Sequence, residues 1–159
     1  MLNLKGADGA ALAERDSVAL QPVLGAAEQS SATAPKCDVL FLYADLSPEG
    51  RISSNGASLR DIVRASEALI VVVASENSAE AYTASGKSGP YGRVNLAMTL
   101  ARKGEAFPLF FRRLFEDMNR GVSMPVAWVK LAPQVPGMEH PDCPEAFFTC
   151  GAGQVRFRR

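Results

Sequence analysis

Two polar side chains follow apolar runs at the points where buried strands are expected to end. Asp45 follows the run at 38–44, and Ser75 follows the run at 69–74. Short apolar runs bounded by turn residues are typical of strands buried on both faces of a parallel sheet. Such a sheet carries its reactive groups at the carboxyl ends of neighbouring strands, so a nucleophilic hydroxyl and a carboxylate could meet there. Asp and Ser also open and cap turns, and that interpretation stays open.

A serine nucleophile needs a base, and the sequence offers two candidates. Asp45 is a weak proton acceptor, because the unperturbed pKa of an aspartate is about 3.9 and serine is a far weaker acid. The only histidine, His140, lies in a proline-rich stretch at 136–144. It could complete a triad, although a lone histidine in such a loop is more often simply exposed.

Two further motifs are rejected as sites. Gly86-Lys87-Ser88 resembles the end of a phosphate-binding loop, but Ala81 stands where that loop has its first glycine. The segment also does not lie directly between a strand and a helix. His140, Cys143 and Cys150 lack a fourth ligand and the closely spaced cysteine pair of a zinc site. We therefore expect no metal and no cofactor.

The remaining segments predict an α/β fold. Ser58 and Asp61 form a capping box that opens a short helix at about 59–65, between the two buried strands. A strand, a helix and a strand in this order are typical of a parallel sheet. The polar, glycine-rich residues 75–92 are expected to form a loop. Later expected elements are a strand or helix start at 93–100, an amphipathic helix at 106–120, a helix at 124–131 capped by Ser123, and a strand at 146–150.

The chain divides by composition near residue 36. Residues 1–36 are rich in Ala, Ser, Gly and Gln and contain no aromatic residue. We expect a flexible or loosely helical tail at 1–36, followed by one domain at 37–159.

Composition limits the class of protein. The chain has 159 residues, of which 47% are hydrophobic, with 17 basic and 17 acidic residues. The absence of net charge argues against nucleic acid or an anionic membrane as the main partner. The longest apolar run, 68–74, is far shorter than the ~20 residues that span a membrane. Three cysteines without paired spacing argue against a disulfide framework, and we expect a cytoplasmic protein.

Taken in order, these segments resemble the CHAT domain, a bacterial branch of the caspase-like cysteine peptidases. In that family one strand ends at the catalytic histidine and a later strand ends at the cysteine nucleophile. The matching stretches here are 38–46 and 71–77, which bring Asp45 and Ser75 to those positions. The resemblance covers about 37–157 and implies a caspase-like three-layer sandwich with a mostly parallel sheet. It also identifies 93–100 as a strand. The other matching segments are 48–63, 94–100, 110–121, 125–134 and 147–153.

The sequence departs from the family pattern in its catalytic pair and at its N-terminal side. A thiolate and an imidazole work together because the pKa of a cysteine falls readily beside a histidine, and serine with aspartate lacks this property. The segment after Ser75 lacks the long helix that the family places there. The sheet is expected to be truncated before the first buried strand, which leaves an open edge for a partner or a second copy.

These departures favour a catalytically degenerate caspase-like domain that acts as a protein-binding or regulatory module. A protein or peptide partner, or a homodimer formed through the open edge, is expected. The alternative is an active hydrolase or peptidase with Ser75 as the nucleophile and Asp45, helped by His140, as the base. A third interpretation is a domain that binds a small molecule in a nucleotide-fold cleft.

Overall fold

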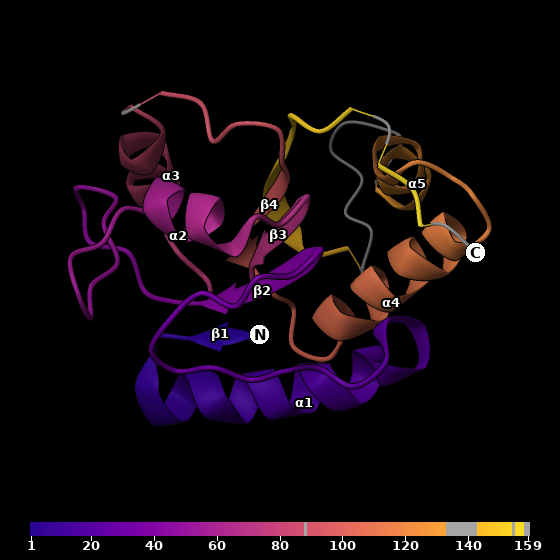
Figure 1. Ribbon diagram of the computed structural model, residues 1–159, viewed down its shortest axis with the longest axis horizontal. Coiled ribbons are helices and arrows are strands. Elements are labelled where there is room, and N and C mark those ends of the chain that lie inside the picture. The colour runs from indigo at the N-terminus through magenta and orange to yellow at the C-terminus, as the bar shows by residue number, and fades with distance from the viewer. Residues whose placement is uncertain (88, 133–142, 154, 158–159) are drawn as a thin grey trace.

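The centre of the molecule is a sheet in the order β1-β2-β3-β4-β5 (Figure 1). The computed structural model describes residues 1–87, 89–132, 143–153 and 155–157. The first four strands run parallel, and the last runs antiparallel to its neighbour. This confirms the α/β class and the mostly parallel sheet. The strands are β1 (Leu2–Asn3), β2 (Val39–Tyr43), β3 (Ile70–Val73), β4 (Asn95–Ala101) and β5 (Glu145–Cys150).

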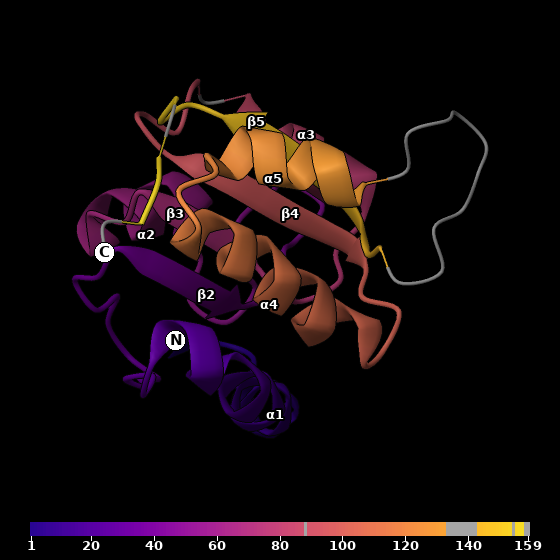
Figure 2. The ribbon, with the colours of Figure 1, turned by 90° about the vertical axis from the view of Figure 1, so that its right-hand side faces the viewer.

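Helices cover both faces of this sheet (Figures 1 and 2). Side chains alternate along β2, so Phe41 and Tyr43 pack against α1 and α4, whereas Leu40 and Leu42 face α2 and α3. Two apolar cores result, one on each face of the sheet. The helices are α1 (Gly6–Leu24), α2 (Leu59–Ser66), α3 (Ala79–Gly86), α4 (Ala106–Asn119) and α5 (Met124–Leu131).

The phenylalanine spacing of the α4 segment builds the larger core. Phe107, Phe111 and Phe115 lie on one face of α4 and contact Phe41 edge-on, with ring centroids 5.7–6.4 Å apart. Edge-to-face rings are favourable because the positive edge of one meets the negative face of the other. The expected helices near 106–120 and 124–131 and the strands near 93–100 and 146–150 are therefore confirmed.

The N-terminal segment corrects the expectation of a flexible or loosely helical tail. β1 pairs with β2, and α1 is a 19-residue helix that packs against α4. Ala13, Asp16 and Leu20 are buried on one side of α1. Their spacing of three and four residues is helical, but Ala and Asp carry too little apolar character to mark a core face in the sequence.

The segment after Ser75 corrects the expectation of a loop at 75–92. It contains α3, whose first turn is capped by Ser78, which accepts a hydrogen bond from the Ala81 amide at 3.2 Å. Its weakly apolar sequence, AEAYTASG, gives no amphipathic pattern, and the buried Tyr82 holds it on the sheet. Gly86, the first residue of the phosphate-loop-like tripeptide, is the last residue of α3, so the motif does not begin after a strand.

No helix among the described residues is long and apolar enough to cross a membrane.

Candidate functional site

Asp45 lies just beyond the carboxyl end of β2, where it was expected. Its Oδ1 forms an ion pair with Lys5 Nζ at 2.6 Å, and half of the Asp45 side chain is exposed (50%). Lys5 precedes α1, so this carboxylate links the N-terminal segment to the sheet.

Ser75 lies just beyond the carboxyl end of β3 and is completely buried (0% exposed). Its Oγ has no hydrogen-bond partner in the part of the chain that the structure describes. An activated hydroxyl requires a base within hydrogen-bond reach and a path for the substrate. Among the described residues no base bonds to the Ser75 hydroxyl, and its complete burial leaves no path for a substrate. His140 lies outside the described residues.

Asn77 and Tyr82 close this edge of the sheet. The Asn77 amide accepts from the Leu46 N–H at 2.7 Å and donates to the carbonyls of Ala44 at 3.1 Å and Ser75 at 3.3 Å. The Tyr82 hydroxyl donates to the carbonyl of Thr99 at 2.9 Å. These two side chains therefore tie together the ends of β2, β3 and β4.

A buried charged network lies at the same edge, on the face covered by α1. The Arg102 guanidinium donates to both carboxylate oxygens of Asp16, at 2.8 and 3.0 Å, and to the Ala74 carbonyl at 2.7 Å. The Tyr43 hydroxyl donates to Asp16 at 2.8 Å, and Arg102 lies 3.9 Å from the centre of the Phe107 ring. Both carboxylate oxygens of Asp16 accept hydrogen bonds, and these bonds offset the free-energy cost of burying the Asp16 and Arg102 charges.

These residues were not predicted from the sequence, each for a different reason. Arg102 follows β4, just as Asp45 follows β2 and Ser75 follows β3. Reactive groups lie at the carboxyl ends of parallel strands, so this principle could also have identified Arg102. Asn77 lies two residues after Ser75, a position from which an Asn side chain bonds nearby backbone. Asp16 carries no such signal, because its partners are 27 and 86 residues away.

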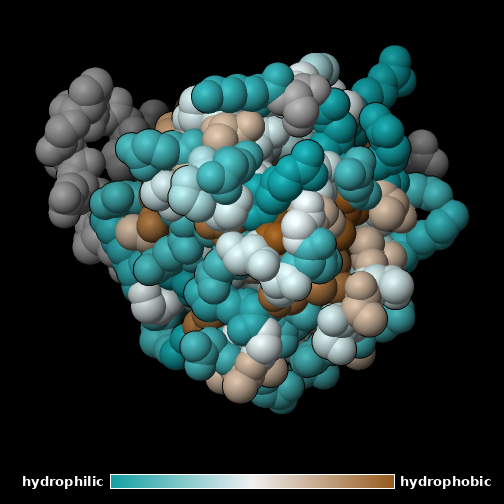
Figure 3. Space-filling model, turned by 90° about the vertical axis from the view of Figure 1, so that its left-hand side faces the viewer, coloured by the Kyte–Doolittle hydropathy of each residue, from teal (hydrophilic) through white to brown (hydrophobic). Residues whose placement is uncertain are grey.

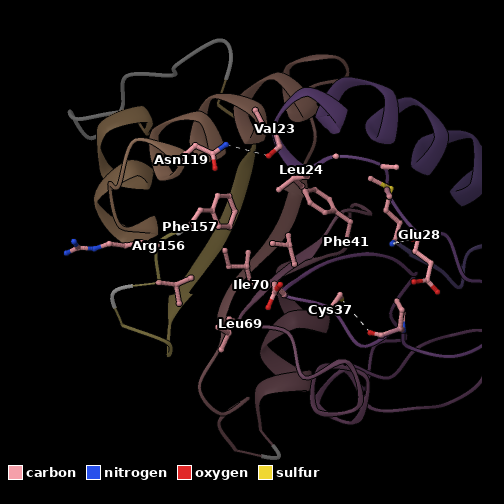
Figure 4. Close-up of a pocket in the computed structure, with 18 residues that line it drawn as sticks. Val23, Leu24, Glu28, Cys37, Phe41, Leu69, Ile70, Asn119, Arg156 and Phe157 are labelled. Atoms are coloured by element: carbon pink, nitrogen blue, oxygen red, sulfur yellow. Dashed lines mark hydrogen bonds between the residues drawn. The ribbon is translucent and has the colours of Figure 1, made fainter. Parts of the chain in front are cut away.

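A hollow lies at the opposite, amino edge of the sheet. Figure 4 shows it between the end of α1, the starts of β2 and β3, and residues 155–157. Its volume is about 820 Å³, within the range typical of ligand sites. Apolar side chains dominate its walls, among them Leu24, Val39, Phe41, Ile70 and Phe157. We refer to it as the amino-edge pocket.

The amino-edge pocket lies beside the part of β2 that β1 leaves uncovered. Among the described residues, β1 pairs only with Leu42 and Tyr43. Val39, Leu40 and Phe41 pair with β3 on their inner side and have no strand on the other. An unpaired strand segment presents backbone N–H and C=O groups that can bind another extended chain. Leu40 and Phe41 are nevertheless almost completely buried (0% and 2% exposed), so Val39 is the accessible residue of this unpaired stretch.

Charged groups of both signs line the amino-edge pocket, and the ammonium of Met1 donates a hydrogen bond to the Glu28 carbonyl. Glu28 and Asp38 are exposed there, whereas the Arg156 side chain points away from the hollow (Figure 4). Cys37 lies in the wall, and partial burial raises the pKa of its thiol, so it is mainly protonated at neutral pH. The wall of the pocket therefore suits an apolar group.

Comparison of the chain with protein-family models, with curated proteins and with solved structures finds no match. The site is therefore interpreted from its own geometry. Among the described residues, no cluster of His, Cys, Asp and Glu has the arrangement of a metal site.

Proposed function

We propose that this chain is a catalytically degenerate caspase-like domain that binds a protein partner, and that an extended segment of that partner enters the amino-edge pocket. The observation that carries the proposal is the position of this pocket. It lies directly beside the unpaired amino half of β2. Strand addition supplies affinity through backbone hydrogen bonds, and an adjacent pocket supplies specificity through a side chain.

The lining of the pocket defines the chemistry of the segment. An apolar side chain would contact Leu24, Phe41 and Ile70, which lie in its walls. A basic residue nearby would face the exposed carboxylate of Asp38, for which no salt bridge occurs among the described residues. Opposite charges at a rim speed association and select the correct partner. The expected ligand is therefore an extended peptide with an apolar anchor and a basic neighbour.

The burial of Ser75 weighs against the alternative of an active hydrolase. Asn77 and Tyr82 occupy the edge at which a substrate would have to reach the hydroxyl. Exposing Ser75 would break the hydrogen bonds of both side chains, and each bond contributes roughly 1 kcal/mol to stability. A binding role needs no such opening.

The proposal is tested by selecting peptides from a random display library with the purified wild-type chain. Leu69 lies in the pocket wall and is 45% exposed, whereas Leu109, on α4, is 47% exposed and lies outside the pocket lining. The two substitutions Leu69→Lys and Leu109→Lys therefore make a matched pair. We expect selected peptides to bind the Leu109→Lys variant as they bind the wild type and to lose at least tenfold in affinity for the Leu69→Lys variant.

Three outcomes would contradict the proposal. The first is that no peptide is enriched, and the second is that both variants bind the selected peptides equally well. The third is that the chain self-associates through a contact that Leu69→Lys alone removes, which would assign the pocket to a second copy. Methylation of alternate backbone nitrogens of a selected peptide is a further check, because it should abolish binding if the peptide adds as a strand.

A further inference from the structure

Strand β5 is the last strand of the sheet, and its outer side is open. It pairs with β4, and no other strand among the described residues lies next to it. Most of its residues are exposed, including Phe147 at 41%. The unpaired stretch of β2 differs, because Leu40 and Phe41 are buried there. β5 is therefore the strand at which a second extended chain can reach the backbone of the sheet.

The hydrogen-bond pattern identifies the backbone groups of β5 that point outward. In an antiparallel pair, alternate residues direct their N–H and C=O groups toward the partner strand. The Gly151 N–H, directly after β5, donates to the Val94 carbonyl at 2.9 Å, so the odd-numbered residues of β5 face β4. The backbone groups of Ala146, Phe148 and Cys150 therefore point away from the sheet, where they can pair with another strand.

These outward groups favour one symmetric register with a second copy of β5. Two copies related by a two-fold axis pair antiparallel, and outward-pointing residues of one copy must meet those of the other. When Phe148 lies opposite Phe148 of the second copy, Ala146 lies opposite Cys150, and each pair can exchange both of its backbone hydrogen bonds. A shift in one direction brings Pro144, which has no N–H, opposite Cys150. A shift in the other brings Ala152, beyond the end of β5, opposite Ala146.

The side chains on both faces of β5 fit this register. On one face Phe148 stacks on Trp128 of α5, with ring centroids 4.6 Å apart and an interplanar angle of 8°. The two Phe148 rings would therefore lie between the two tryptophans of the dimer. On the other face the exposed Phe147 would lie opposite Thr149 of the second copy, at a position without backbone hydrogen bonds, where side chains approach most closely.

Charge favours a second copy as the occupant. Glu145 is the only charged residue of β5, and in this register it lies opposite Gly151 of the second copy, so like charges do not meet. The whole chain has 17 basic and 17 acidic residues, so two copies do not repel each other at long range.

The exposed apolar side chains near β5 also favour this edge. Figure 3 views the molecule from the side on which α2 and α3 lie in Figure 1, and this surface is mainly hydrophilic, with hydrophobic side chains gathered in one central area. Helix α5 lies along β5 (Figure 2), and its Val126 side chain is 50% exposed. With Phe147, it adds apolar surface to the two elements at the open side of the sheet.

We propose that two copies of this chain pair through β5, with Phe148 opposite Phe148, and form a reversible two-fold symmetric dimer with one continuous sheet. The paired stretch is short, so the interface belongs to the small and weak class, and its dissociation constant is expected in the micromolar range. None of the described residues that line the amino-edge pocket belongs to β5, so the dimer is independent of the proposed peptide site.

Sedimentation velocity of the full chain under reducing conditions tests the proposal. We expect the wild type to shift from monomer to dimer as its concentration rises through the micromolar range. Cys150→Pro removes one outward N–H, and an edge strand tolerates proline where that N–H faces solvent. This variant should dimerise at least tenfold more weakly than the wild type. Cys150→Ser is the matched control, because it keeps the backbone N–H, and it should dimerise as the wild type does.

Crosslinking gives a second measurement that does not depend on the folding of Cys150→Pro. Ala146 lies opposite Cys150 of the second copy in this register, with Cα atoms about 5.5 Å apart, which is within the reach of a disulfide. Mild oxidation of Ala146→Cys should therefore give a covalent dimer linked between positions 146 and 150. Ala146→Cys combined with Cys150→Ser should give none.

A wild type that stays monomeric at every concentration would overturn the proposal. Equal dimerisation of Cys150→Pro and Cys150→Ser would also overturn it, as would an Ala146→Cys variant that forms no link to position 150. A dimer that Leu69→Lys removes would assign self-association to the amino-edge pocket instead.

Discussion

At the scale of single residues, position at a strand end did not guarantee a reactive group. The sequence placed Asp45 and Ser75 correctly at the ends of β2 and β3. It could not show that Lys5 pairs with Asp45 or that Asn77 and Tyr82 cover the edge next to Ser75. These contacts depend on residues that meet only after folding. The simpler interpretation of Asp45 and Ser75, as residues at turns, fits their surroundings.

The unpartnered hydroxyl of Ser75 leads to a stability prediction. Replacing Ser75 with Ala removes a buried polar group that makes no hydrogen bond, so the free energy of unfolding should stay unchanged or rise by about 1 kcal/mol. Ser66 is the matched control, because it is equally buried and its Oγ donates to the Val63 carbonyl at 2.8 Å. Ser66→Ala should cost about 1–2 kcal/mol. Urea unfolding measures both, and a Ser75→Ala variant that loses more than the control would contradict this account.

At the scale of elements, apolar patterns predicted the strands of the sheet better than they predicted helix α1, which covers one face of it. The runs that became β2 and β3 are apolar at every position, because both of their sides are buried. α3 was not predicted, and α1 was expected only as part of a flexible or loosely helical tail, because neither helix has a clear apolar face. α3 is held by Tyr82, and α1 depends on a buried ion pair that no local pattern encodes.

The role of that ion pair in docking α1 can be measured. Asp16→Ala leaves the Arg102 guanidinium buried without its carboxylate, so it should destabilise the fold by about 3–5 kcal/mol. Arg15→Ala breaks an exposed pair of the same helix with Glu105 and should cost less than about 1 kcal/mol. Chemical denaturation compares the two variants. A loss in Asp16→Ala no larger than that in Arg15→Ala would show that Asp16 does not hold α1.

At the scale of the whole molecule, the three tyrosines report on folding at high pH. Burial raises the pKa of Tyr43, Tyr82 and Tyr91, and for Tyr43 the Asp16 carboxylate raises it further. Their contribution to stability is complete below the pKa of an unfolded tyrosine, about 10, and is lost as the pH rises above it. Each phenol that ionises only in the unfolded chain lowers stability by about 1.4 kcal/mol per pH unit.

Absorbance at the phenolate band tests this prediction. Fewer than half of the phenols should be ionised at pH 10 in the folded chain, and the main rise in absorbance should accompany the loss of circular dichroism. The denatured chain serves as the control and should titrate near its ordinary pKa. A phenol that titrates normally while the folded spectrum persists would contradict the burial described here.

The two edges of the sheet differ in what they can bind. The carboxyl edge is closed by side-chain hydrogen bonds, whereas the amino edge combines a hollow with an unpaired stretch of β2. Amide hydrogen exchange with and without a display-selected peptide compares these edges in one measurement. We predict slower exchange at 25–28 and 38–41 on binding, and unchanged exchange at 44–46 and 75–77. Protection confined to 44–46 and 75–77 would contradict the account.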